Sequence, residues 1–153
     1  MNDAARQAID RLGLAPLPQE GGFFRATWRN STASAILYLI TAGDFSALHR
    51  LAQDEVWHFC IGDPVEHVQL DPRGGRVRTA RLGPDLARGH LPQVVVPAGV
   101  WQGARLVVGA SGFALLGCTV SPPWDERGFE LGSRATLRAA FPAHHAIVQD
   151  FTR

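Results

Sequence analysis

Residues 43–62 read GDFSALHRLAQDEVWHFCIG. Two runs with the length and composition of β-strands, 45–51 and 55–61, lie on either side of a short polar turn. His49 stands near the end of the first run and Glu55 at the start of the second. If the two runs are adjacent antiparallel strands, we expect these two side chains to meet on one face of the sheet.

Alternation along the second run predicts which neighbours share that face. Trp57 and Phe59 point the same way as Glu55, whereas His58 points to the other side. Polar groups that face the interior of a small barrel are costly unless they are paired, so they form either a structural network or a site. We interpret His49 and Glu55 as an acid–base pair in which the carboxylate orients the imidazole. The alternative is a buried pair that only satisfies itself.

The strand pattern continues over most of the chain. Further short runs bounded by Gly, Pro, Asp or Asn cover residues 23–28, 34–41, 65–71, 76–82, 93–96, 101–107 and 113–120. Residues 3–13 have the spacing of an amphipathic helix, and Pro142 separates two short helices in the tail from Ser133 to Arg153. The sequence therefore predicts one all-β domain, 1–153, a sandwich or barrel with short N-terminal and C-terminal helices.

Composition excludes several classes of protein. Of the 153 residues 46% are hydrophobic and 19% are charged, which is inconsistent with a disordered chain. The net charge of +1 leaves no basic surplus for nucleic acid, so we expect no nucleic-acid partner. The chain contains no lysine, which excludes a Schiff base and therefore pyridoxal phosphate (PLP) as a cofactor.

The distribution of cysteine and of apolar residues predicts a cytoplasmic protein. Cys60 and Cys118 both lie in apolar runs, and we interpret them as two buried free thiols in a reducing compartment. The polar N-terminus does not resemble a signal peptide. The longest charge-free apolar stretch, 106–120, is broken by glycines and is too short to span a bilayer, so no membrane partner is expected.

The stretch 43–62 resembles the first conserved motif of the cupin superfamily, with Gly43, His49, Glu55 and Gly62 in register. Residues 97–102, PAGVWQ, resemble the second motif. The sequence is most similar to a subfamily of small single-domain cupins, DUF985, through EGGFFR (20–25), DEVWHF (54–59), GDP (62–64), LGPDL (82–86), PAGVWQ (97–102) and GCTV (117–120). The resemblance implies a double-stranded β-helix, the jelly-roll cupin barrel, which forms a homodimer and has a ligand cavity in its mouth.

The resemblance also defines the positions at which metal-binding cupins carry His, His, Glu and His. Here those positions hold His49, Leu51, Glu55 and Gln102. A neutral amide is a poor ligand for a first-row transition metal, and a stable site needs three or four good ligands. No cofactor is therefore firmly implied, and a divalent metal held by His49, Glu55 and Gln102 stays open as an alternative.

Other residues are candidates for binding a ligand. Gln102 would orient it through hydrogen bonds from inside the barrel. Arg25 would hold a carboxylate or phosphate, with Glu20 keeping its guanidinium in place. Tyr38, the one tyrosine, is the one phenolic acid available. The aromatic residues expected in the cavity wall, or alternatively in ordinary core, are Tyr38, Trp57, Phe59 and Trp101.

These features favour an enzyme that binds a sugar derivative or a carboxylated metabolite and isomerises or epimerises it by proton transfer. The resemblance supports that class because some sugar-epimerising cupins need no metal. Two alternatives stay open: a binding module that does not turn its ligand over, and a dimeric scaffold with a vestigial site. An outward-facing stripe of His58 and His67 would fit a dimer interface.

Overall fold

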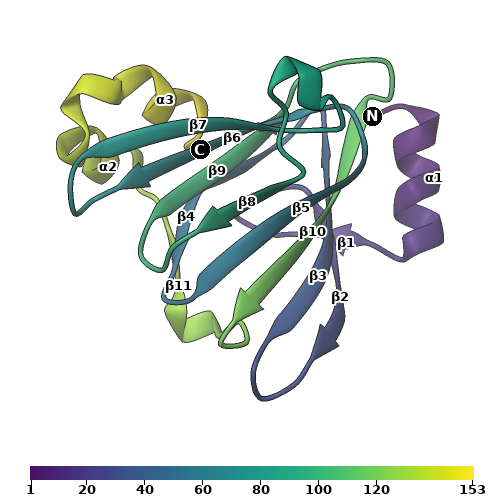
Figure 1. The fold of residues 1–153 in the computed structure, drawn as a ribbon, viewed down its shortest axis with the longest axis horizontal. Helices are drawn as coiled ribbons and strands as arrows, with labels where there is room; N and C mark the ends of the chain where they lie inside the picture. Colours follow the sequence, from purple (N-terminus) through teal and green to yellow (C-terminus); the bar gives the residue numbers. More distant parts are fainter.

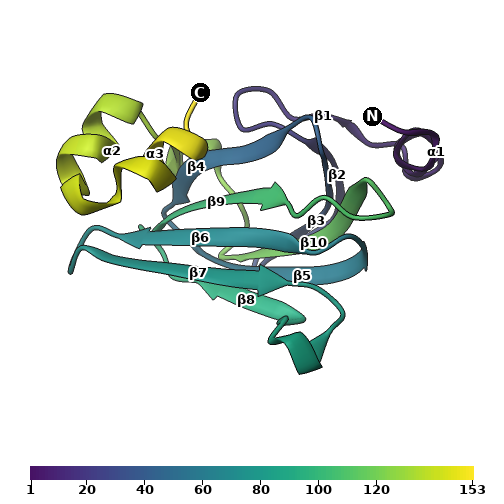
Figure 2. The same cartoon turned by 90° about the horizontal axis from the view of Figure 1, so that it is seen from above.

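The computed structural model describes residues 1–153 and contains two antiparallel sheets that face each other (Figures 1 and 2). The first sheet has the order β1 (Ala15–Pro16), β2 (Phe23–Arg29), β3 (Ser34–Thr41), β10 (Phe113–Ser121), β5 (Asp54–Gly62), β8 (Gln93–Val96). The second sheet has the order β11 (Phe129–Leu131), β4 (Phe45–Leu51), β9 (Trp101–Leu106), β6 (Val65–Asp71), β7 (Arg76–Leu82). This arrangement confirms the all-β jelly-roll prediction.

Helices lie outside the two sheets (Figure 2). Helix α1 (Asp3–Leu12) packs on the outer face of the first sheet, and helices α2 (Arg134–Ala140) and α3 (His145–Asp150) pack on the outer face of the second. Short 3-10 turns complete the chain at Leu86–Arg88, Glu126–Gly128 and Pro142–His144. None of the helices has the length and apolar composition needed to cross a membrane.

The pairing of β4 and β5 differs from the sequence-based expectation. The two strands are not neighbours: β4 pairs with β9 and β11, whereas β5 pairs with β10 and β8. Residues 52 and 53 carry the chain from one sheet to the other. His49 and Glu55 therefore approach each other across the barrel, from facing sheets, and not side by side within one sheet.

The core has an inner part between the sheets and an outer part beneath each terminal helical segment. Trp101 belongs to the outer part: it is 5% exposed and packs with Leu137 and Phe141 of the C-terminal segment. Its side chain therefore lies on the face of β9 opposite to Gln102. The prediction that Trp101 lines the cavity was wrong, because residue 101 lies on the face of β9 that points away from the barrel interior.

The predicted histidine stripe is also wrong. His58 lies on the outer face of β5, beside Gln93 and Thr119. His67 is fully buried between the sheets, with its ring against Trp57. A homodimer consequently stays a prediction that rests on the family resemblance. Of the two cysteines only Cys118 is buried, and Cys60 is exposed.

Candidate functional site

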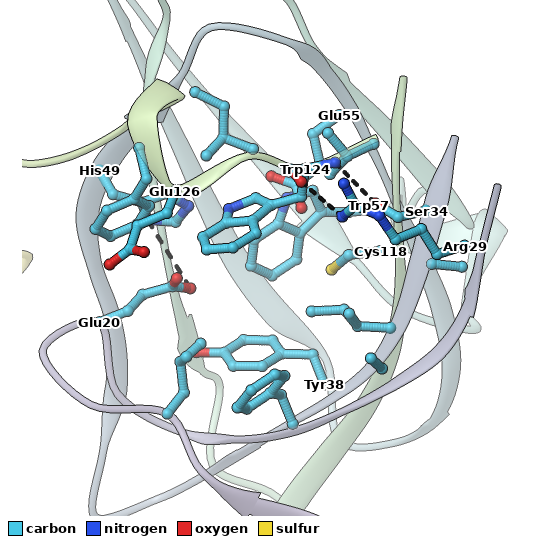
Figure 3. Close-up of a pocket in the computed structure, with 18 of the residues that line it drawn as sticks. Glu20, Arg29, Ser34, Tyr38, His49, Glu55, Trp57, Cys118, Trp124 and Glu126 are labelled. Atoms are coloured by element: carbon cyan, nitrogen blue, oxygen red, sulfur yellow. Dashed lines mark hydrogen bonds and ion pairs between the residues drawn. The ribbon is translucent and has the colours of Figure 1, made fainter. Parts of the chain in front are cut away.

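A cavity of about 450 Å³ opens between the two sheets at the end of the barrel near the β2–β3 hairpin (Figure 3). Most of its wall is apolar or aromatic. His49, Glu55, Tyr38 and Trp57, four of the residues expected from the sequence, all line it. Additional aromatic side chains that sequence reasoning did not assign to the cavity are Phe24, Trp28, Trp124 and Phe129.

Glu55 is held from behind by a chain of buried hydrogen bonds. The Gln102 side-chain amide donates to Glu55 Oε2 at 2.6 Å, and Trp57 Nε1 donates to Gln102 Oε1 at 2.8 Å. Gln102 does not itself line the cavity. It acts on the site through Glu55, so its expected direct contact with a ligand is not what the structure shows.

The carboxyl group of Glu55 has an unusual protonation equilibrium. Burial raises the pKa of Glu55 to about 7, and the nearby Glu20 carboxylate acts in the same direction, whereas His49 and Gln102 oppose the rise. The Glu55 carboxyl group is therefore partly protonated near neutral pH. A carboxyl group of this kind can both give and accept a proton under physiological conditions.

The orientation of His49 comes from the backbone and not from a carboxylate. Its Nδ1 lies 2.8 Å from the carbonyl oxygen of Ala47. A carbonyl oxygen only accepts, so Nδ1 carries the hydrogen and Nε2 of the neutral ring has a free lone pair. Phe129 stacks on the ring with centroids 5.6 Å apart. No hydrogen bond joins His49 directly to Glu55, so the expectation that Glu55 orients the imidazole was wrong.

Glu20 is a third ionisable group at the site, and sequence reasoning gave it another role. It lines the cavity, accepts a hydrogen bond from Ser46 Oγ at 2.8 Å, and lies 3.9 Å from His49 Nδ1. Arg25, its expected partner, is exposed on the opposite face of β2 and lies outside the cavity wall. Nothing in the local sequence indicates that Glu20 approaches β4.

An irregularity in β4 brings Glu20 to the site. The pairing of β4 with β9 changes register between Ser46 and His49, which frees the backbone groups between them. The Ala47 N–H donates to the carbonyl of Glu20 at 2.8 Å, and the Leu48 N–H donates to Phe151. One interruption in a strand therefore docks both the Glu20 loop and the end of the C-terminal helix.

Two glycines let this loop pass close to the barrel. Gly21 and Gly22 both have positive φ angles, of 105° and 73°. A Cβ atom on Gly22 would lie 2.7 Å from the Tyr38 hydroxyl oxygen and 2.8 Å from the Leu39 carbonyl oxygen. The Gly-Gly pair is therefore required by both backbone conformation and space.

Tyr38 supports the same loop. Its hydroxyl donates to the Gly21 carbonyl at 2.8 Å. Burial, followed by the nearby Glu20 carboxylate, raises the pKa of Tyr38 well above 10. Tyr38 thus stays protonated, and its hydroxyl hydrogen is engaged by the Gly21 carbonyl. This favours a structural role for Tyr38 over the role of catalytic acid that the sequence suggested.

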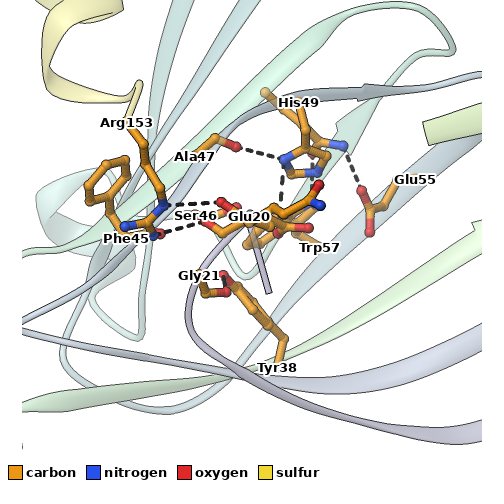
Figure 4. Close-up of polar contacts among 12 residues, drawn as sticks. Glu20, Gly21, Tyr38, Phe45, Ser46, Ala47, His49, Glu55, Trp57 and Arg153 are labelled. Carbon is orange, nitrogen blue, oxygen red and sulfur yellow. Dashed lines mark hydrogen bonds and ion pairs between the residues drawn. The ribbon is translucent and has the colours of Figure 1, made fainter. Parts of the chain in front are cut away.

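Arg153 clamps the Glu20 loop to the second sheet (Figure 4). Its guanidinium donates to the carbonyls of Gln19, Glu20 and Phe45, and to Asp44 Oδ1 at 2.6 Å. It also lies over the Phe45 ring, 4.5 Å from the centroid. Five contacts from one side chain fix the backbone that positions the Glu20 carboxylate.

Replacing Arg153 with Ala is expected to loosen this loop while the barrel stays folded. Because the guanidinium is 43% exposed, we expect a loss of only about 1 kcal/mol in the free energy of unfolding. The amide of Gly22 should exchange with solvent much faster, measured by hydrogen exchange. Arg88→Ala, which removes an exposed arginine far from the loop, is the control, and equal exchange in both variants would contradict the clamp.

Phe59 also lies outside the cavity wall, although it faces inward. It is partly buried and packs against the inner core deeper in the barrel. Trp124 lies at the cavity mouth instead. Its backbone N–H donates to Ser34 Oγ, and its carbonyl oxygen accepts a hydrogen bond from Arg29 Nη1. The sequence carried no spacing signal for this contact, because Trp124 lies in an irregular segment.

A family model described as Cupin superfamily (DUF985) matches residues 6–132 of the chain. The chain belongs to this family. A protein of Shewanella oneidensis has a similar structure, with a TM-score of 0.91 and 38% identity, over 100% of this chain and 99% of that one. A hypothetical protein from Leishmania major has a TM-score of 0.89 and 31% identity, over 97% of this cupin and 98% of that chain.

More distant cupins share the fold alone. Oxalate decarboxylase from Bacillus subtilis superimposes with a TM-score of 0.62 and 12% identity, over 90% of this chain and 37% of that one. No curated protein matches the sequence. The comparisons therefore establish the family and the fold, and the chemistry of the site has to be argued from its geometry.

The donor set of this cupin does not fit the metal site of metal-binding cupins. The second histidine position is Leu51, an apolar side chain in the cavity wall. At the last position, the amide oxygen of Gln102 already accepts a hydrogen bond from Trp57, and its nitrogen donates to Glu55. Only His49 and Glu55 remain, which is too few ligands for a stable transition-metal site.

We expect the natural protein not to bind Mn²⁺ or Zn²⁺ tightly, and the double variant Leu51→His, Gln102→His to bind either ion. The variant would supply three histidines and one carboxylate around the same cavity. Calorimetric titration of both proteins measures the difference. Micromolar binding by the natural protein, abolished in His49→Ala, would show that the donor set is sufficient after all.

Proposed function

We propose that this cupin binds a small molecule in the barrel cavity and moves a proton on it, as an isomerase or epimerase does. The observation that supports this proposal is the pairing of two different proton-carrying groups at one cavity. His49 presents Nε2, the ring nitrogen that has no hydrogen bond within the chain, from one sheet, and Glu55 presents a carboxyl group with a raised pKa from the facing sheet. A base and an acid on facing walls are what a proton shift requires.

His49 is the base in this mechanism. Its Nε2 removes a proton from a carbon next to a carbonyl group, and the C–H electron pair passes into the enolate. The hydrogen bond from Nδ1 to the Ala47 carbonyl holds the ring in place and stabilises the imidazolium that forms. The Glu20 carboxylate, 3.9 Å from Nδ1, adds to that stabilisation.

Glu55 is the acid. In its protonated form it returns a proton to the carbon skeleton at the new position or on the opposite face, so that no oxidant or reductant is needed. The raised pKa of about 7 keeps that proton available at neutral pH. After each turnover His49 loses its extra proton to water and Glu55 takes one up from water. In heavy water Glu55 therefore carries deuterium, which it transfers to the product.

The test is solvent deuterium incorporation. Small carbonyl compounds that raise the melting temperature of the protein are incubated with it in heavy water and analysed by mass spectrometry. We expect at least one to take up deuterium, at a rate that falls as the pH rises above about 7 and Glu55 loses its proton. If stabilising compounds are found but none takes up deuterium, the cupin is a binding module.

A further inference from the structure

At the inner end of the cavity, the polar atoms that have no hydrogen-bond partner in the chain act as acceptors when Glu55 is ionised. No hydrogen bond within the chain reaches His49 Nε2, Glu55 Oε1 or Glu20 Oε2. The donors nearby are already used: Tyr38 on Gly21, Ser46 on Glu20, and the Trp57 indole on Gln102. A molecule that binds here must bring the donors.

The charged residues of the cavity wall also favour a ligand that donates hydrogen bonds and carries a positive charge. Its wall contains three carboxylates, Glu20, Glu55 and Glu126, and one guanidinium, Arg29. Arg29 is exposed at the mouth and donates through Nη1 to the Trp124 carbonyl. Glu55 is only 6% exposed, and no arginine forms an ion pair with it. Burying a carboxylate without a counter-charge is costly, and a cation in the cavity would offset that cost.

The rest of the wall suits an organic cation and not a small inorganic one. Aromatic rings of Phe24, Trp28, Tyr38, Trp57, Trp124 and Phe129 line the cavity. Aromatic faces attract ammonium groups and bury apolar skeletons. A volume of about 450 Å³ accommodates a molecule of the size of a substituted bicyclic ring.

We propose that the ligand of this cavity is an organic ammonium ion, with the charged nitrogen between Glu20, His49 and Glu55 and an apolar or aromatic skeleton against the outer rings. This proposal rests on the proposed function only in taking the cavity as the substrate site. It disfavours carboxylates and phosphates as ligands, because their charge would face Glu20 and Glu55, while the one guanidinium of the wall, Arg29, lies out at the mouth and donates to the Trp124 carbonyl.

Three probes of one shape test the proposal by calorimetry: tryptamine, tryptophol and indole-3-acetate, which carry an ammonium, a hydroxyl and a carboxylate on the same skeleton. We expect tryptamine to bind with a Kd below about 1 mM, tryptophol about tenfold more weakly, and indole-3-acetate not at all. Binding of the acid as tight as that of the amine, equal binding of amine and alcohol, or no binding of the amine would overturn the proposal.

Two variants locate the charge that is recognised. Glu20→Gln should weaken tryptamine binding about tenfold and leave tryptophol binding unchanged. Asp10→Asn, which removes the same charge from the exposed face of α1, should change neither. Equal effects of the two variants would contradict a contact in the cavity.

The two proposals fail independently. Amine binding without any deuterium uptake would leave the ligand class standing and refute the proton transfer. Deuterium uptake by a neutral or anionic substrate would support the proton transfer and refute the ligand class.

Discussion

Replacing His49 with Gln is expected to lower the rate of solvent deuterium incorporation by roughly 10²–10⁴-fold, the usual contribution of a positioned general base. Glutamine retains a polar side chain of similar length but has no basic nitrogen. The rate is measured by mass spectrometry on the substrate found in the screen. Because His49 is buried, circular dichroism and a thermal melt must first show that the variant is folded.

A second variant separates the base from the acid. Glu55→Gln keeps a hydrogen-bond partner for Gln102 but cannot deliver a proton, so the rate should fall by a similar factor. The remaining activity should lose its decline above pH 7, because the group with the raised pKa is gone. A His49→Gln variant with a rate within about threefold of the natural protein would remove His49 from the mechanism.

Replacing His67 with Phe is expected to make the protein more resistant to acid. Both nitrogens of His67 are buried without a hydrogen-bond partner, and burial lowers the pKa of His67 from 6.5 to about 4. The unfolded chain therefore binds this proton more tightly than the folded one, so stability is lost as the pH falls from about 6.5 towards 4. The loss approaches about 3 kcal/mol.

Glu55 has the opposite effect on stability over nearly the same range. Its pKa is raised from 4.5 to about 7, so the folded protein holds that proton more tightly than the unfolded chain. This contribution is fully present below about pH 4.5 and is lost as the pH rises through 7, again by about 3 kcal/mol. In the natural protein the two slopes nearly cancel.

Chemical denaturation between pH 4 and 8 measures these slopes. Relative to the natural protein, His67→Phe should gain stability as the pH falls, and Glu55→Gln should gain stability as it rises. Repacking around the new Phe side chain changes the free energy of unfolding by the same amount at every pH. It therefore does not affect the comparison, which uses only the change of stability with pH. His145→Gln, an exposed histidine in the tail, should follow the natural profile. Parallel profiles for all four proteins would show that neither buried group is linked to folding.

The positions of the strands were predictable from the sequence because they depend on local signals. The runs 34–41, 45–51, 65–71, 76–82 and 93–96 coincide with β3, β4, β6, β7 and β8. Each is flanked by Gly, Pro, Asp or Asn, or by a short polar segment, which end strands through backbone geometry. The two-residue strand β1 and the short β11 were missed, since so few residues carry no periodic pattern.

The candidate site was predictable where alternation decides it. His49, Glu55, Tyr38 and Trp57 reach one cavity because each faces inward on its strand. Alternation could not show that β4 and β5 lie in opposite sheets, since a short polar turn is compatible with a hairpin or with a corner between sheets. The prediction for Trp101 failed because both faces of β9 are buried. An apolar residue on this strand can face the barrel interior or, as Trp101 does, the helices α2 and α3 outside it.

The sequence alone was sufficient for the family, the positions of most strands along the chain and the placement of His49 and Glu55 at one site, because motif spacing and residue alternation are properties of the local chain. Only the tertiary structure placed Glu20 beside His49, turned Gln102 towards Glu55 and Trp57, and buried His67 without a partner. These contacts join segments that are far apart along the chain. Their geometry depends on an irregular strand and on the docking of the C-terminal segment, neither of which leaves a pattern in the neighbouring residues.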